Sequence, residues 1–132
     1  MKKKLINIYW FKRDLRLEDN EPLHEASKQS EKLLLIYFLE DKLISDPHYS
    51  NFHWNFVKQS IEDINLSLGK KSILFLNCDP IEGFKKISQK YKIKSIYSHM
   101  ETGIELTYLR DINVKKYCDS NSINWFEYEK NY

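Results

Sequence analysis

The sequence predicts an α/β domain with a three-layer, Rossmann-like sheet of five mainly parallel strands. Short apolar runs alternate with capped or amphipathic helical segments along all 132 residues. The run LLLIYFL at residues 33–39 is continuously apolar, which is typical of a parallel strand covered on both faces. Strands separated by helices require right-handed crossovers, so the sheet is expected to be mainly parallel. We expect the strand order 3-2-1-4-5, counting strands along the chain.

The first half of the chain contains two expected strands and two expected helices. Residues 5–11 are rich in Ile, Tyr, Trp and Phe, as in a buried strand. Asp19 or Asn20 caps a helix to Ser30, with Pro22 tolerated in its first turn. The strand at residues 33–39 follows. A longer helix is expected over residues 49–68, because its apolar residues step by three and four positions.

The second half continues the alternation. Residues 72–76 form the third strand. Asp79, Pro80 and Glu82 then supply a cap, a first-turn proline and a capping-box glutamate for a helix to Tyr91. Residues 94–98 form the fourth strand, residues 103–120 the last helix and residues 124–128 the last strand.

Composition and spacing exclude several kinds of site. The net charge of +2 is small, so direct DNA binding is not expected. Neither a signal peptide nor an apolar run long enough to span a membrane is found, and Cys78 and Cys118 are expected to be reduced thiols of a cytoplasmic protein. The three glycines form no phosphate-binding motif, the four histidines have no metal spacing, and no Ser or Cys lies on a glycine-flanked elbow. We therefore expect neither catalytic residues nor metal ligands.

The ends of the strands supply the candidate binding residues. Ligands of doubly wound sheets sit outside the carboxyl edge of the sheet, where the strand order reverses. Aromatic walls with a few charged groups suit a planar, polar heteroaromatic ligand better than a phosphate ester. The alternative is that these charges only solvate loop ends and pair with one another. The candidates that follow the first, second and fourth strands are Lys12, Arg13, Asp14, Tyr37, Glu40, Met100, Glu101 and Gly103.

Arg110 is a further candidate on the last expected helix. It shares a helix face with Thr107 and Val114, so it is expected to point toward the sheet. An inward guanidinium requires a carboxylate or a bound anion. We favour a structural ion pair with Asp14 or Glu101 over a bound anion.

The segment WFKRDLRLEDN at residues 10–20 resembles the N-terminal signature of the photolyase/cryptochrome family, with Lys12 where arginine is usual. Three further segments resemble the same family: FHWNF at residues 52–56, SHMETG at residues 98–103 with Arg110-Asp111, and INW at residues 123–125. The resemblance covers essentially the whole chain.

This resemblance implies an N-terminal antenna domain over residues 1–132 that can hold a light-harvesting chromophore. The family's FAD and DNA-lesion groove belong to a following helical domain, which is the expected partner. That domain is absent from this chain, so we expect no DNA repair by the chain alone, although the parent family includes light-dependent lyases. The Asn-Glu pair of folate-binding members falls near Leu106-Thr107, so a deazaflavin or flavin is favoured over a folate.

Two other functions remain as alternatives: a ligand-free docking module for a helical FAD domain, and a free-standing nucleotide-binding domain. Because the family packs its second domain against this one, we also expect some self-association of the isolated chain. The candidate aromatic residues for that contact are Trp10, Trp125, Tyr128 and Tyr132, with Trp10 favoured as a core residue.

Overall fold

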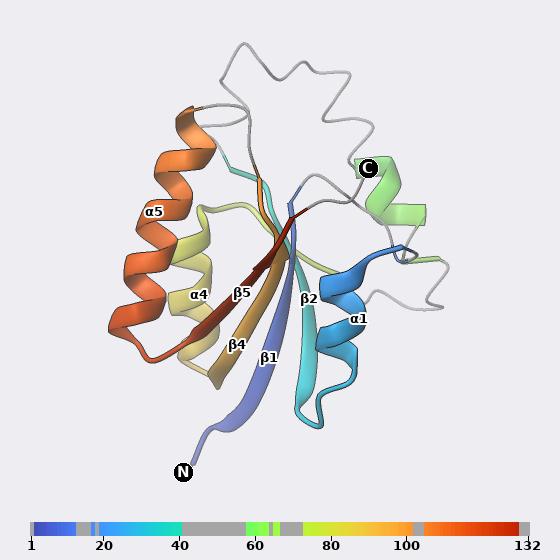
Figure 1. Cartoon of the computed structure of the whole chain (residues 1–132). Coiled ribbons are helices and arrows are strands. Elements are labelled where there is room, and N and C mark those ends of the chain that lie inside the picture. Colours follow the sequence, from blue (N-terminus) through green and yellow to red (C-terminus); the bar gives the residue numbers. More distant parts are fainter. Residues whose placement is uncertain are drawn as a thin grey trace.

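The computed structural model describes residues 2–12, 17, 19–40, 58–63, 65–66, 73–101 and 105–129. Its five strands form one sheet in the order β3-β2-β1-β4-β5, and every neighbouring pair is parallel (Figure 1). The expected fold class and strand order are therefore confirmed. The strands are β1 (Lys4–Phe11), β2 (Lys32–Phe38), β3 (Ile73–Leu76), β4 (Tyr91–His99) and β5 (Asn124–Tyr128).

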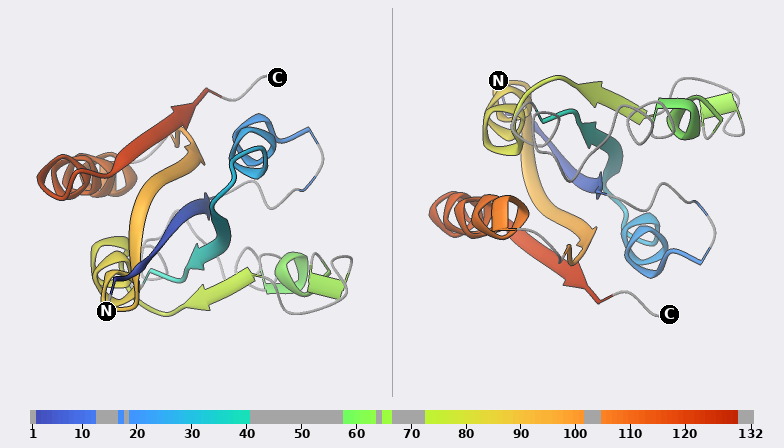
Figure 2. Two further views of the ribbon diagram at one scale, coloured as in Figure 1. Left: turned by 90° about the horizontal axis from the view of Figure 1, so that it is seen from below. Right: turned by 90° about the horizontal axis from the view of Figure 1, so that it is seen from above.

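Three labelled helices pack on the sheet: α1 (Glu21–Ser27), α4 (Pro80–Ser88) and α5 (Glu105–Ser120). Helices α4 and α5 cover one face, while α1 and the helical residues 58–63 and 65–66 lie on the other (Figure 2). The outer part of the helix expected over residues 49–68 lies outside the described residues.

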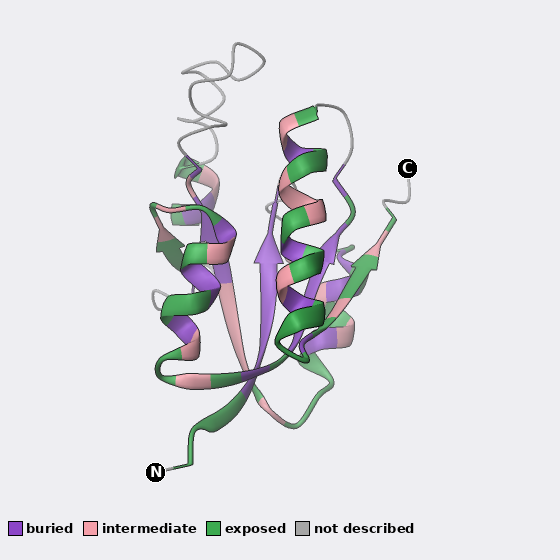
Figure 3. Ribbon diagram, turned by 90° about the vertical axis from the view of Figure 1, so that its left-hand side faces the viewer, coloured by how far each residue is buried: buried purple, intermediate pink, exposed green. Residues whose placement is uncertain are grey.

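Alternation along β1 divides the core between the two faces. Ile6, Ile8 and Trp10 enter the apolar cluster under α4 and α5. Tyr9 and Phe11 enter the second cluster, which contains Ala26 of α1 and Ile61. Burial is concentrated in the central strands, with exposed residues on the outer faces of the helices (Figure 3). This division follows from the two-residue period of a strand covered on both sides.

Local sequence explains where the helices begin. The side chain of Asn20 accepts a hydrogen bond from the Leu23 amide at 3.1 Å, and that of Asp79 accepts one from the Glu82 amide at 3.1 Å. Both expected caps are confirmed, with Asn20 rather than Asp19 in the first. Each cap satisfies an amide that has no partner within the helix.

Two helix ends differ from the expected positions. Helix α1 ends at Ser27 rather than Ser30. Helix α4 ends at Ser88, and Tyr91 is the first residue of β4. Neither helix end is followed directly by a glycine or proline that would mark it in the sequence. The helices end where they do because the strand that follows needs extended backbone.

Helix α4 lies very close to β2. A Cβ atom on Gly83 would collide with the ring of Phe38, and that ring packs edge-on against Phe84 at a centroid distance of 5.2 Å. The missing side chain thus allows the helix to approach the strand, and it holds the N-terminus of α4 beside the carboxyl edge of the sheet.

Candidate functional site

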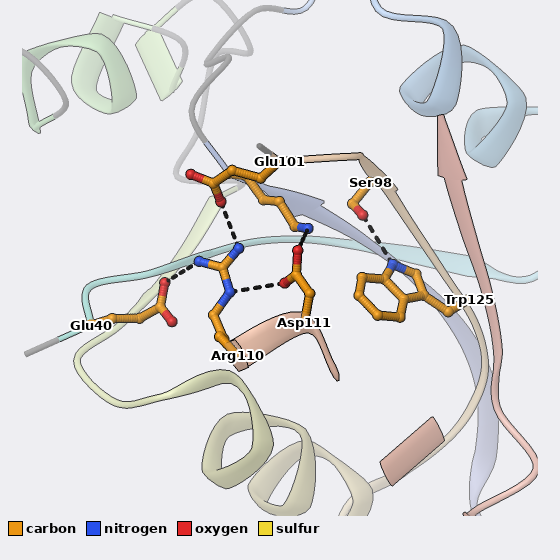
Figure 4. A network of polar contacts seen from close by, with 7 residues as sticks. Glu40, Ser98, Glu101, Arg110, Asp111 and Trp125 are labelled. Atoms are coloured by element: carbon orange, nitrogen blue, oxygen red, sulfur yellow. Dashed lines mark hydrogen bonds and ion pairs between the residues drawn. The ribbon is translucent and has the colours of Figure 1, made fainter. Parts of the chain in front are cut away.

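A cluster of charged side chains lies at the carboxyl edge of the sheet, centred on Arg110 of α5 (Figure 4). Its Nη1 donates to Glu40 at 2.9 Å and its Nη2 donates to Glu101 at 2.6 Å. Its Nε donates to Asp111 at 3.0 Å. Glu40 follows β2 and Glu101 follows β4, so one guanidinium ties two strand exits to the helix.

Lys12, the residue after β1, joins the same cluster. Its Nζ donates to the second carboxylate oxygen of Asp111 at 3.0 Å, and its side chain is 2% exposed. The ammonium also lies over two aromatic rings, 4.5 Å from the centroid of Trp10 and 5.1 Å from that of Trp125. Such contacts are attractive because the face of an indole ring is electron-rich.

The two indoles form the apolar floor of the cluster. Their centroids are 5.8 Å apart with an interplanar angle of 27°, and the guanidinium carbon of Arg110 lies 5.0 Å from the Trp10 centroid. Trp125 is fixed in this position by a 3.0 Å hydrogen bond from its Nε1 to Ser98 Oγ. Strand β5 therefore contributes to the site through the packing of Trp125, and the charges of Lys12 and Arg110 also act on its Glu127.

The charges of the cluster do not balance. Three carboxyl groups face two cations, so full ionisation would leave one net negative charge in a largely buried place. Burial raises the pKa of Glu40 to about 7, against the opposing attraction of Arg110. Burial alone would lower the pKa of Arg110, but the neighbouring carboxylates outweigh it and raise that pKa. Glu40 is thus a carboxyl group that can carry a proton near neutral pH.

Lys12 responds in the opposite direction to Arg110. Burial lowers the pKa of Lys12, although the charge of Asp111 opposes this effect. The delocalised guanidinium of Arg110 is always protonated in proteins, whereas a buried ammonium loses charge more easily. The permanent positive charge of the cluster therefore belongs to Arg110.

A cavity of about 520 Å³ opens beside this cluster, between the start of α4 and α5. This volume lies within the usual range for small-molecule sites, about 300–1,000 Å³. Carboxyl, amide and guanidinium groups line its wall together with aliphatic side chains. Its lining includes Glu40, Asn77, Leu106, Leu109, Arg110 and Asn113.

The structure brings together four of the nine residues expected at the site: Lys12, Glu40, Glu101 and Arg110. The expected Arg110–Glu101 ion pair is present. Met100 lies beside the cluster with 39% of its surface exposed, and its amide donates to the Tyr128 carbonyl at 2.7 Å. Arg13, Asp14 and Gly103 lie outside the described residues.

Tyr37 is not in the charged cluster. It belongs to the apolar cluster on the α1 face of the sheet and stacks on Phe75 at 5.7 Å. The reason is strand alternation, because Phe38 occupies the other face of β2. Tyr37 and the Arg110 cluster therefore belong to opposite layers.

Three contributions were missed by sequence reasoning. Asp111 bridges Lys12 and Arg110, although adjacent helical residues do not normally share a face. Trp125 was assigned to an exposed contact surface rather than to the floor of the site. Asn77 lines the cavity, and its position directly after β3 was the available signal. Within the described residues, no group of three His, Cys, Asp or Glu side chains is placed to hold a metal ion.

Comparison with known proteins places the chain in one family. The DNA photolyase family model matches residues 7–132. Cryptochrome DASH of Synechocystis sp. is 30% identical over 101 residues, which cover 71% of this chain and 21% of that protein. The chloroplastic/mitochondrial cryptochrome DASH of Arabidopsis thaliana is 28% identical over 109 residues, which cover 76% of this chain and 19% of the relative. The chain thus spans about a fifth of the length of these relatives.

Solved structures agree with the sequence comparison. The cryptochrome of Synechocystis sp. PCC6803 superposes with a TM-score of 0.86 at 26% identity, over 98% of this chain and 28% of that one. An archaeal photolyase from Sulfolobus tokodaii, solved with two FAD molecules, superposes with a TM-score of 0.78 at 26% identity, over 94% of this chain and 29% of that one.

Two findings bear on membrane association and location. Among the described residues no helix combines the length and hydropathy needed to cross a membrane. Plant relatives carry the words chloroplastic/mitochondrial in their names, so the expected cytoplasmic location stays a prediction. The family model, the curated relatives and the fold agree on the point that matters for function: the chain belongs to the DNA photolyase family and corresponds to its N-terminal α/β domain.

Proposed function

We propose that this domain, residues 1–132, is a light-harvesting antenna that binds a planar chromophore at the carboxyl edge of its sheet. The cavity beside Glu40 and Arg110 is the observation that carries the proposal. A bound chromophore would supply light absorption and transfer of excitation energy. The receiving FAD would belong to a helical domain of the whole protein, where repair of DNA or blue-light signalling would take place.

The chemistry of the cavity wall fits a heteroaromatic ring. Leu106, Leu109 and Val114 offer aliphatic contacts, while the amides of Asn77 and Asn113 can each donate and accept. Glu40, with its pKa near 7, can donate to a ring nitrogen or carbonyl when protonated and accept from a ring N–H when ionised. The edge of a flavin or deazaflavin ring carries both hydrogen-bond donors and acceptors. The cavity walls therefore match such a ring better than they match a ligand with several carboxylates.

Neighbouring residues fix the orientation of the polar groups. Arg110 holds Glu40 through a 2.9 Å bond, so the carboxyl group cannot rotate freely into the cavity. The packing of Gly83 against Phe38 holds the start of α4 at the opposite wall. The domain itself would perform no bond chemistry, and these residues would act by positioning the chromophore.

The test is the absorption and fluorescence of the purified chain, followed by titration with riboflavin and FMN. A band at wavelengths longer than the protein aromatics that survives desalting would support the proposal. Asn113→Trp places an indole in the cavity wall and should abolish flavin binding. Lys116→Trp makes the matched change on an exposed part of α5 and should leave binding unchanged. Equal binding by both variants would place the flavin elsewhere.

A second function, a ligand-free docking module for the helical domain, is favoured by one observation. All three nitrogen positions of Arg110 already bind carboxylates of this chain, so no ligand is required to satisfy them. This function predicts a bare aromatic spectrum together with stable binding to a separately expressed helical domain of a related photolyase. Heat on titration with adenine nucleotides would instead favour the nucleotide-binding alternative.

A further inference from the structure

Charge is distributed unevenly between the two ends of the sheet. The charged cluster around Arg110 lies at the carboxyl edge, and Glu31, directly before β2, lies at the amino edge. The amino edge, where all five strands begin, is rich in exposed lysines. We call four of these the amino-edge lysines: Lys4 in β1, Lys32 in β2, Lys90 after α4 and Lys92 in β4.

Strand register places these lysines at one edge of the sheet, with Lys4 and Lys32 on the face of Ile6 and Lys92 on the opposite face. Lys4 lies opposite Tyr91 and Leu5 lies opposite Lys92 across the β1–β4 pair. On the other side of β1, Ile6 lies opposite Lys32. Neighbouring strands are about 4.8 Å apart, which is less than the Debye length of about 8 Å at physiological salt. The fields of Lys4 and Lys32, which lie on the same face, therefore reinforce each other at this edge.

Tyr91 links two of the lysines directly. The Nζ of Lys32 lies 5.6 Å from its ring centroid and that of Lys90 lies 5.5 Å from it. The two ammonium groups are thus no further apart than the sum of these distances. Placing two cations around one half-buried ring concentrates positive charge at the base of the sheet.

Carboxylates do not neutralise this group. Lys94 nearby is paired with Glu31 at 2.8 Å, and Lys3 donates to the Ser88 carbonyl at 2.6 Å. Within the described part of the chain, none of the four amino-edge lysines forms an ion pair with a carboxylate. The C-terminus of α4 is the negative end of its helix dipole and favours a cation nearby, such as Lys90. Lys4, Lys32 and Lys92 belong to strands, so this dipole does not account for them.

The composition of this face distinguishes among anionic partners. Protein interfaces are depleted in lysine and depend on aromatic or arginine anchors, and neither is exposed among these lysines. Stable membrane attachment needs inserted apolar groups as well as positive charge, and Leu5 is the one large apolar side chain exposed beside them in the described residues. Binding to the phosphodiester backbone of a nucleic acid requires only flexible cationic side chains and no contacts with the bases.

From this juxtaposition we propose that the amino edge of the sheet binds nucleic acid through its phosphate groups, without sequence preference. The site lies at the opposite edge from the proposed chromophore cavity and does not depend on it. The small net charge of the chain led to the expectation of no direct DNA contact. A small net charge does not exclude a local group of positive charges. A DNA-binding experiment decides whether this group of lysines binds DNA.

The experiment measures the fluorescence anisotropy of a labelled 30-base-pair duplex of mixed sequence, titrated with the full chain at several salt concentrations. The triple variant Lys4→Gln, Lys32→Gln, Lys90→Gln removes three charges from one face of this edge. The control variant Lys58→Gln, Lys115→Gln, Lys116→Gln removes the same charge from exposed helical positions. Circular dichroism checks that both variants are folded.

We expect salt-sensitive binding by the wild-type chain and by the control variant. The triple variant should lose about tenfold or more in affinity, and its salt slope should be shallower by up to about 2.7, at about 0.9 per phosphate contact on duplex DNA. No binding by the wild type at low salt, or an equal loss in the control variant, would overturn the proposal. Binding to phosphatidylserine vesicles or to polyglutamate without binding to DNA would also overturn it.

Discussion

Glu40 connects the charge balance of the site to the stability of the domain. Its pKa of about 7 in the folded chain lies above the ordinary value of 4.5, so the folded state holds a proton that the unfolded state releases. The stabilisation from Glu40 is therefore fully present below about pH 4.5 and is lost as the pH rises through 7. Glu40→Gln keeps the shape and an acceptor for Arg110 but cannot ionise. Since one pKa unit corresponds to about 1.4 kcal/mol, the variant should gain about 3 kcal/mol over the wild type between pH 4.5 and pH 8.

Urea unfolding followed by tryptophan fluorescence at half-unit steps of pH measures this difference directly. The quantity to plot is the unfolding free energy of Glu40→Gln minus that of the wild type, because shared titrations cancel. Glu105→Gln, at an exposed position on α5, serves as the control for the loss of one carboxylate from the surface. A flat difference for Glu40→Gln would show that burial of excess charge does not govern the cluster.

Three further predictions test other parts of the structure. Arg110→Met should destabilise the domain by about 3–5 kcal/mol in urea unfolding, because it leaves buried carboxylates without their cation; Arg110→Lys should lose less, and equal losses would indicate packing rather than charge. Gly83→Ala should cost about 1–3 kcal/mol through overpacking against Phe38, a result that an unchanged melting temperature would refute. Phe126, 44% exposed on the edge strand β5, should contribute to self-association, so light scattering should show a smaller mass for Phe126→Ser than for the wild type at high concentration; a strict wild-type monomer would contradict this.

Much of the fold could be predicted because local and global signals agree. The apolar run of β2 and the caps Asn20 and Asp79 each specify one element through short-range chemistry. The end of α4 could not be located in the same way, because Lys90 and Tyr91 carry no stop signal and the pairing of Tyr91 with β1 decides the boundary. Sequence patterns therefore located the starts of elements better than their ends.

The site was only partly predictable for a related reason. Topology places every strand exit at one edge, and this was enough to bring Lys12, Glu40 and Glu101 together. Tyr37 lies on the other face of the sheet because side chains alternate along β2. Applying the two-residue period of a strand to each residue of β2 would have predicted this. The stack of Trp10 on Trp125 depends on the placement of the last strand relative to the first, and no local pattern encodes that distance.

The charge balance of the cluster also bears on what the cavity accepts. Arg110 is fully occupied by carboxylates, so it has little capacity left to bind an anion. When Glu40 ionises, the cluster becomes net negative and repels an anionic group that approaches the same wall. A neutral ring that offers both a donor and an acceptor meets no such barrier and can share the proton of Glu40. Thus the ion pairs that satisfy Arg110 favour a neutral heteroaromatic ring at this wall, and any charged tail of the ligand should extend away from it toward solvent.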